Sequence, residues 1–307
     1  MTYILQTVNL SKSYKNKEVV ANINMNIKKG EIYSFLGPNG AGKTTVMKML
    51  TGLVKPTSGS IEIFGEPLLT TSYEVFKRIG SIIEYPIFYN HLTAQENLDV
   101  HCKYMGYYDK KAIDEALELV QLKQIDNKPV QEFSLGMKQR LGIARAVCTR
   151  PELLILDEPI NGMDPIGIHE LRELFRVLSK EYGMTLLISS HILQEVEQIA
   201  DTIGVINQGK LIEEVSMESI HSKYSEYIEV VTTNGKQAAF ILEEKLCIVN
   251  YKMVDVNAIR IYEPHVSPVD IAKTLIMHDV GIEALNKKNV SLEEHFLALI
   301  QGGGVHD

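Results

Sequence analysis

Alternating apolar and polar residues open the chain, a pattern typical of half-buried β-strands. The alternation runs through residues 2–14 (TYILQTVNLSKSY) and again through residues 19–38 (VVANINMNIKKGEIYSFLGP). From Gly42 the pattern changes, because GKTTVMKMLTGL has apolar residues at helical spacing. We therefore expect a β-rich N-terminal segment that leads into a helix.

Further along, the patterns predict buried strands between amphipathic helices. Apolar residues at three- and four-residue spacing predict helix over Gln95–Gln121 and over Pro165–Glu181. The short apolar runs Leu153–Asp157 and Met184–Ser190 are typical of parallel strands that are buried on both faces. Strands that alternate with helices indicate an α/β layered domain.

Beyond about Val215 the chain changes character. Residues 216–307 carry eight basic and thirteen acidic residues, a net charge of −5 out of the total of −8. The predicted order is strand, helix, two strands, helix, strand and helix, over Tyr227–Thr232, Lys236–Leu246, two strands around Asn257, Pro268–His278, Ile282–Asn286 and Leu292–Ile300. This order resembles a small split-βαβ domain. We predict two domains, residues 1–215 and a small α+β C-terminal domain of residues 216–307.

Composition narrows the class of protein. The chain has 307 residues, about the length of two domains, and its 45% hydrophobic and 23% charged residues are typical of a globular protein. A formal charge of −8 argues against a nucleic-acid-binding surface. The sequence has no long uncharged apolar stretch and no secretory signal, so another chain would have to supply any membrane part. The spacing of Cys102, Cys148 and Cys247 suggests neither a zinc site nor a disulfide framework, which fits a reducing cytosol.

The strongest chemical motif is GPNGAGKT, from Gly37 to Thr44. It fits G-x-x-x-x-G-K-[ST] between an apolar run and a helix, where backbone N–H groups form a nest for phosphate oxygens. Lys43 is expected to reach the β- and γ-phosphates of a nucleotide, and the Thr44 hydroxyl to bind Mg²⁺. A glycine-rich turn that happens to precede a helix is the alternative. The predicted nucleotide-binding residues here are Gly37, Asn39, Gly40, Gly42, Lys43, Thr44 and Thr45.

A second motif, which is acidic, strengthens this interpretation. Four apolar residues lead into Asp157, and Glu158 follows. A carboxylate at the end of a buried strand beside a phosphate loop can hold Mg²⁺, and the next carboxylate would then polarise the attacking water. The alternatives are a helix N-cap for Asp157 and an exposed charge for Glu158.

The segment FSLGMKQRLGIARA (Phe133–Ala146), shortly before LLILDEP, resembles the signature of ABC ATPase subunits. The resemblance covers about residues 1–215 and implies a P-loop NTPase fold with a helical subdomain and an antiparallel β subdomain. It further implies that Ser134 and Gly136 contact ATP bound to a second copy of the chain. Leu135 and Met137 replace the usual glycine and glutamine, and an ordinary capped helix is the alternative reading.

Three further matches follow from the resemblance. Tyr14 occupies the position at which the family stacks an aromatic ring on adenine, although a tyrosine packed in a sheet is the alternative. His191 matches the residue that contacts the γ-phosphate and Glu158, with a core histidine as the alternative. Asn161 and Asp164, in NGMD, match a loop that crosses the dimer interface, and a plain turn is the alternative.

Glu84 departs from the family, which usually has glutamine there. A glutamate could still bind Mg²⁺, but with a full charge, and it would repel phosphate if the metal were absent. A neutral replacement is the alternative. Glu84 and FSLGMKQR together resemble the bacitracin-resistance and lantibiotic-immunity exporters.

The expected function is the ATP-hydrolysing subunit of an ABC exporter, which powers efflux of an antimicrobial peptide through a separate membrane permease. Mg²⁺ with ATP, a nucleotide-sandwich homodimer, a cytoplasmic position on the inner face of the membrane, and no nucleic-acid partner are also expected. Two alternatives stay open, a soluble ABC ATPase without a transporter and a nucleotide-binding regulatory module with little turnover. Soluble ABC ATPases usually have two cassettes or a coiled coil, and a low-turnover regulatory module would not need Lys43, Asp157, Glu158 and His191.

Overall fold

A six-stranded sheet forms the centre of the N-terminal part, in the order β10-β9-β3-β8-β7-β6. The strands are β3 (Ile32–Leu36), β6 (Ile79–Ile82), β7 (Leu153–Leu156), β8 (Thr185–Ser190), β9 (Thr202–Asn207) and β10 (Lys210–Ser216). All neighbours pair in parallel except β10, which is antiparallel to β9. Every residue of β3, β7 and β8 is buried, which explains why apolar residues predominate in β3 and make up the whole of β7.

The computed structural model describes residues 2–69, 72–107, 109–125, 128–223, 226–263, 266–289 and 296. The chain divides into two units, Met1–Met217 and Glu218–Asp307. The boundary expected from the sequence, between residues 215 and 216, lies just before this division.

A second, antiparallel sheet has the order β2-β1-β4-β5. Its strands are β1 (Tyr3–Tyr14), β2 (Lys17–Lys28), β4 (Ser58–Ile63) and β5 (Glu66–Pro67). Its apolar side chains share one core with helix α1 (Lys43–Leu50) and one face of β7, as Leu5, Val46, Leu153 and Ile155 show. The helix that follows the phosphate loop is therefore anchored in the core that joins the two sheets.

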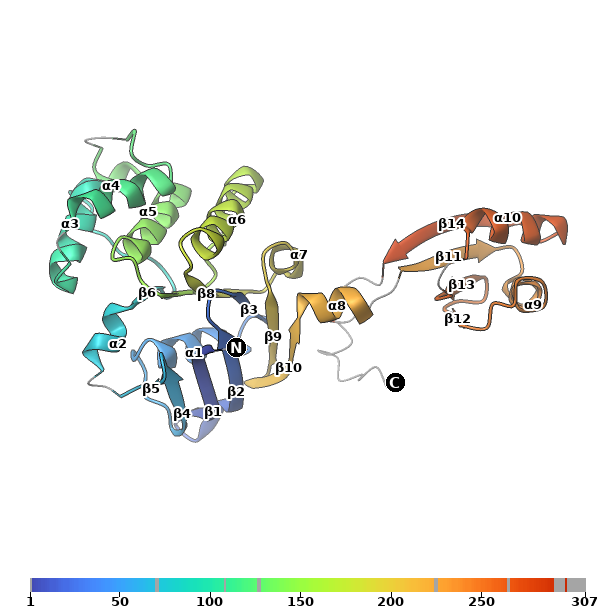
Figure 1. Ribbon diagram of the computed structural model, residues 1–307, viewed down its shortest axis with the longest axis horizontal. Helices are drawn as coiled ribbons and strands as arrows, with labels where there is room; N and C mark the ends of the chain where they lie inside the picture. Colours follow the sequence, from blue (N-terminus) through green and yellow to red (C-terminus); the bar gives the residue numbers. More distant parts are fainter. Residues whose placement is uncertain are drawn as a thin grey trace. The chain divides into compact units, whose positions relative to one another are not determined.

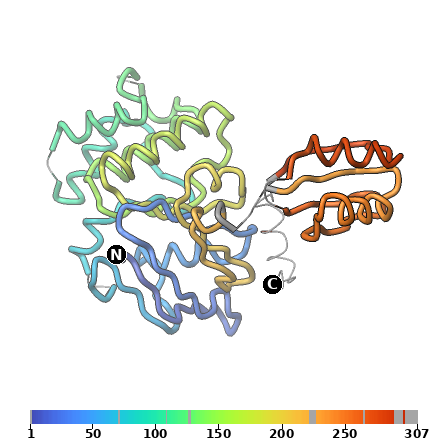
Figure 2. Tube along the Cα trace, turned by 45° about the vertical axis from the view of Figure 1, so that its right-hand side comes forward, coloured from blue at the N-terminus to red at the C-terminus, as the bar shows by residue number. Residues whose placement is uncertain are grey.

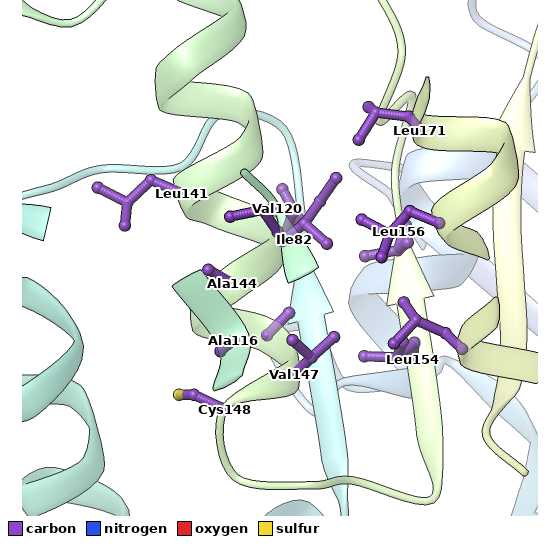
Figure 3. Packing of buried hydrophobic residues seen from close by; sticks show 14 of the residues in the cluster. Ile82, Ala116, Val120, Leu141, Ala144, Val147, Cys148, Leu154, Leu156 and Leu171 are labelled. Carbon is purple, nitrogen blue, oxygen red and sulfur yellow. The ribbon is translucent and has the colours of Figure 1, made fainter. Parts of the chain in front are cut away.

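Helices cover the other face of the parallel sheet (Figures 1 and 2). They are α3 (Ala94–Met105), α4 (Lys110–Leu119), α5 (Leu135–Val147) and α6 (Pro165–Lys180), while the shorter helices are α2 (Tyr73–Lys77), η1 (Val130–Glu132) and α7 (Leu193–Glu197). Leu154 and Leu156 of β7 pack against this layer, as Figure 3 shows. The free thiols of Cys102 and Cys148 lie 3.6 Å apart within it.

The prediction of one helical segment over Gln95–Gln121 is wrong in one respect, because the segment forms two helices, α3 and α4. Gly106 ends α3 with a left-handed φ of 68°, and Asp109 caps the start of α4 by accepting from the backbone N–H groups of Lys111 and Ala112. The break lets the two helices fold against each other, because a glycine pays no Cβ penalty in this conformation.

The second unit contains β11 (Glu226–Thr232), α9 (Gly235–Leu246), β12 (Tyr251–Met253), β13 (Ala258–Ile261), α10 (Pro268–Met277) and β14 (Ile282–Asn289), and α8 (Met217–Lys223) begins at the division. Its antiparallel sheet has the order β12-β13-β11-β14, the split-βαβ arrangement that the element order predicts. It has its own core, centred on Val230, Leu242 and Leu275. The helix expected over Leu292–Ile300 lies outside the described residues. Among the described helices, none combines the length and hydropathy needed to cross a bilayer.

Candidate nucleotide site

The phosphate loop lies between the end of β3 and the start of α1. Gly40 and Gly42 have positive φ values of 80° and 109°, while Asn39 is exposed and Thr45 lies in the first turn of α1. Gly37 donates its N–H to the carbonyl of Ser190, and a Cβ there would lie 2.3 Å from the carbonyl oxygen of Ile206. The parallel sheet therefore admits no side chain at the first position of the motif.

Backbone groups support this loop from behind. Gly209, in the turn between β9 and β10, donates its N–H to the carbonyl of Ala41 at 2.9 Å and accepts from the N–H of Ala21 in β2 at 2.8 Å. A Cβ on Gly209 would lie 2.5 Å from the carbonyl oxygen of Val19. Main-chain hydrogen bonds thus join the loop, the antiparallel sheet and this turn, in addition to the packing of the side chains of Val20, Ala41 and Ile206.

Lys43 is buried, with 5% of its surface exposed. Its ammonium donates to the carbonyl of Gly37 at 2.6 Å and to that of Pro38 at 3.3 Å, and it lies 3.2 Å from Oε1 of Glu158. The cation is held at the loop by neutral acceptors and one carboxylate. A phosphate group can compete for this ammonium, because it offers charged oxygens.

Thr44 and Asp157 come together although they are far apart in the sequence. The Thr44 hydroxyl donates to Oδ2 of Asp157 at 2.7 Å, and Oδ1 accepts from the hydroxyl of Ser189 at 2.6 Å. Asp157 is buried at the carboxyl end of β7. A hydroxyl and a carboxylate are the hard oxygen donors that suit Mg²⁺, which is bound in proteins by one or two carboxylates together with phosphates and water. This pair therefore fits the metal.

Glu158 lies between two partners. Its Oε1 faces Lys43, and its Oε2 lies 2.7 Å from Nδ1 of His191. Its backbone has a φ of 48°, a left-handed conformation that is uncommon for a residue with a side chain. The carboxylate is half-buried, so Glu158 is not the exposed charge of the alternative interpretation. His191, which contacts it, is not an isolated core histidine.

The sequence analysis missed two residues near the carboxyl end of β8. They are Ser189, whose hydroxyl donates to Asp157, and Glu195, which accepts from the hydroxyl of Ser190. The hydroxyl of Ser190 donates to Glu195 at 3.2 Å and accepts from the N–H of Ile192 at 3.0 Å, which orders the turn around His191. Burial raises the pKa of Glu195. Both residues lie within four positions of His191, which is the only sequence signal that could have pointed to them.

Glu84 and Tyr14 are both exposed. Glu84 follows strand β6, and Tyr14 is the last residue of strand β1. Glu84, with a φ of 63°, forms an ion pair with Lys48 of α1 at 2.7 Å. Its charge is therefore partly neutralised, which the sequence analysis did not foresee. Tyr14, at the end of β1, is 46% exposed, and the Lys12 ammonium lies 4.9 Å from its ring centroid. Tyr14 is thus not a packed sheet tyrosine.

The two predicted interface segments cap helices within their own chain. Ser134 accepts the N–H of Met137 at the start of α5, and Asp164 accepts that of Gly167 at the start of α6. Asn161 is exposed and its N–H donates to the carbonyl of Glu158.

The two segments also lie side by side. A Cβ on Gly136 would be 3.7 Å from Met163, and one on Gly162 would be 3.2 Å from Leu135, whose side chain is 59% exposed. The signature segment and the 161–164 loop therefore form one continuous surface.

Comparison with known proteins supports the same assignment. A family model described as ABC transporter matches residues 20–161. The chain is 64% identical to the ABC transporter ATP-binding protein YcbN of Bacillus subtilis (strain 168) over 99% of both chains. It is 46% identical to the bacitracin transport ATP-binding protein BcrA of Bacillus licheniformis, over 99% of this chain and 100% of that protein. It is 52% identical to the lantibiotic transport ATP-binding protein SrtF of Streptococcus pyogenes, over 68% of this chain and 89% of that protein.

The fold of the chain is also similar to that of a solved structure. A dimeric ATP-binding cassette in a post-hydrolysis state, bound to ADP and Pi, matches with a TM-score of 0.63 and 26% identity, over 69% of this chain and 98% of that chain. The fold class and the family expected from the motifs are confirmed. The chain belongs to the ABC transporter family, as an ATP-binding subunit with ATPase activity.

Proposed function

We propose that this protein powers the export of an antimicrobial peptide of the bacitracin or lantibiotic type through a separate permease, and so confers resistance or immunity. Similarity to the bacitracin transport ATP-binding protein along nearly the whole chain, the second unit included, supports this cargo class. The observation that carries the proposal is the convergence of Lys43 and His191 on Glu158, beside the pair of Thr44 and Asp157. This set contains a phosphate ligand, a metal ligand and a base.

The chain's own residues define the proposed reaction. The ammonium of Lys43 moves from Glu158 to the β- and γ-phosphates of the nucleotide. Glu158 then accepts a proton from the attacking water. His191 holds the other oxygen of Glu158 and so keeps the base oriented. Thr44 and Asp157 would hold Mg²⁺, which when bound would supply charge neutralisation at the phosphate groups. Positioning and charge neutralisation supply most of the rate in such reactions.

A second copy completes the proposed site. Ser134 and Leu135 are exposed at the start of α5, where the N-terminal dipole of the helix favours an anion. In the proposed dimer, Ser134 and Gly136 of one copy contact the γ-phosphate bound by the other, and Asn161 and Asp164 lie at the interface. Tyr14 stacks on the adenine.

The permease is proposed to dock on the surface that follows Glu84, on the inner face of the membrane. Tyr85, Ile87 and Tyr104 are each at least 80% exposed, and Ile87 and Tyr104 line a groove of about 380 Å³. Burial, with the nearby charge of Arg145, lowers the pKa of His101 to about 4, so this lining residue is neutral at physiological pH. An exposed apolar surface beside a groove in which Arg145 is the charged lining residue suits a helix end from a membrane protein.

A complementation experiment tests the proposal. Cells that lack this protein but keep its permease are complemented with the parent or with Glu158→Gln and are exposed to bacitracin or to a lantibiotic. We expect the parent to raise the inhibitory concentration and Glu158→Gln to fail, while the exposed Glu197→Gln serves as a matched control that restores resistance. Unchanged sensitivity with an active parent ATPase would contradict the proposed cargo and leave the ATPase assignment intact.

A further inference from the structure

One hydroxyl contacts both acidic residues of the site. Strands β7 and β8 pair in parallel with Leu156 opposite Ile188, which places Ser189 beside Asp157. The Ser189 hydroxyl donates to Oδ1 of Asp157 at 2.6 Å and accepts from the N–H of Glu158 at 2.8 Å. Ser189 is fully buried.

The contact with Asp157 determines where that carboxylate points. Oδ1 is occupied by Ser189, so Oδ2 is the oxygen that faces the hydroxyl of Thr44 at 2.7 Å. Without the Ser189 hydroxyl, a buried carboxylate oxygen would lose its donor, and rotation of the carboxylate would compete with metal binding.

The contact with Glu158 supports its left-handed backbone. Such a conformation persists in a non-glycine residue only where the surroundings determine it. The Ser189 hydroxyl accepts the N–H of this residue, and the turn continues with the N–H of Asn161 donating to the Glu158 carbonyl. The direction in which the side chain of Glu158 leaves the strand thus depends on Ser189.

We propose that Ser189 is a positioning residue that orients both the carboxylate of Asp157, the proposed metal ligand, and the side chain of Glu158, the proposed base. The inference rests on the roles proposed above for Asp157 and Glu158. In this proposal Ser189 acts through these two neighbours, which its hydroxyl contacts, and not as a ligand of the nucleotide or the metal.

The test is Ser189→Ala in the full chain. We expect the Mg²⁺ concentration for half-maximal ATPase to rise about tenfold and kcat to fall about tenfold, as is typical when a group that orients a metal ligand is removed. Binding of a fluorescent ATP analogue in EDTA should match the parent, because Lys43 and the phosphate loop are untouched. The gain in affinity of this analogue on adding Mg²⁺ should be smaller than in the parent.

Two further variants separate positioning from packing. Ser189→Thr keeps the hydroxyl and should recover most of the Mg²⁺ response. Ser34→Ala removes another fully buried hydroxyl, on the neighbouring strand β3, where Ser34 pairs with Ile188. The Ser34 hydroxyl has no hydrogen-bond partner within the described part of the chain, so this matched control should leave the Mg²⁺ response unchanged.

The outcomes distinguish the hypotheses. A parent-like Mg²⁺ response in folded Ser189→Ala would overturn the inference, as would an equal shift in Ser34→Ala. If Ser189→Thr does not fold, the comparison of the two alanine variants still decides. The binding measurement needs neither export nor turnover, so a failure of the proposed cargo would not affect it.

Discussion

At the scale of single residues, the charged groups of the site are arranged so that each has a partner that a ligand can displace. Glu158 is shared between Lys43 and His191, and Glu84 is paired with Lys48. The pairing of the buried Lys43 with Glu158 avoids an uncompensated buried ion, which would be costly. Exchange of partners, rather than creation of charge, is therefore the physical basis of the proposed cycle.

The role of Glu158 as base gives the first prediction. Glu158→Gln should retain ATP binding and lower kcat at least about 100-fold, because an amide cannot accept the proton. Phosphate release and equilibrium binding measure the two quantities. A rate within twofold of the parent would contradict the assignment.

The ion pair of Glu84 gives the second prediction. In EDTA, Glu84→Gln should bind ATP about two- to fivefold more tightly and Lys48→Met about two- to fivefold more weakly, the range expected for one exposed charge pair. The double variant should fall near Glu84→Gln, since Lys48 acts by neutralising this carboxylate. Isothermal titration calorimetry measures the affinities, and equal values for all four proteins would mean that the glutamate is a neutral replacement.

Several of these contacts could not be predicted from the sequence, for a physical reason. The phosphate loop, Asp157 and Glu158 form local motifs, and spacing alone points to them. The pairing of Lys48 with Glu84 depends on how α1 and the end of β6 approach each other. Ser189 depends on strand register, which no local pattern at a serine reveals.

At the scale of elements, the helix starts in the two proposed interface segments have a structural role within their own chain. Ser134 and Asp164 each satisfy an N–H group of their own helix, so they contribute to folding before any second copy is present. Thr93 caps α3 in the same manner, in a capping box with Glu96. Thr93 lies outside the segments predicted to contact a second copy, which makes it a suitable comparison for dimerisation.

The third prediction uses this comparison. Ser134→Ala and Thr93→Ala should each lower the free energy of unfolding by about 1 kcal/mol, because each removes one cap. Only Ser134→Ala should also reduce ATP-dependent dimerisation of the Glu158→Gln background, measured by light scattering. Equal dimerisation in both variants would remove Ser134 from the interface.

Element patterns were predictable where burial is uniform and less so where the chain turns. The runs that became β7 and β8 are fully buried and read clearly as strands. The break at Gly106 was not visible, since apolar spacing continues on both sides of it. The closeness of Cys102 and Cys148 likewise arises from helix packing, not from spacing.

At the scale of the whole molecule, the chain has separate cores in its two units. The element order predicted the split-βαβ topology of the second unit, because short connections leave few ways to order four strands. All residues of the predicted nucleotide site lie in the first unit.

The fourth prediction follows from this division. Calorimetry of the full chain should show two unfolding transitions, because each unit has its own core. Mg-ADP at 100 times its dissociation constant should add about 2.7 kcal/mol to the stability of one unit only. A single transition, or equal shifts in both, would show that the units unfold together.

The main-chain junction behind the phosphate loop has a consequence for sequence variation. Gly209 belongs to no recognisable motif, yet a methyl group there would push on the carbonyl of Val19 and, through Ala41, on the proposed phosphate loop. Tolerance to mutation in this protein should therefore follow crowding of the backbone rather than distance from the chemistry. Gly209, which is distant from the motif in sequence and which no catalytic argument would single out, is expected to be as intolerant of replacement as Gly37, the first glycine of the motif.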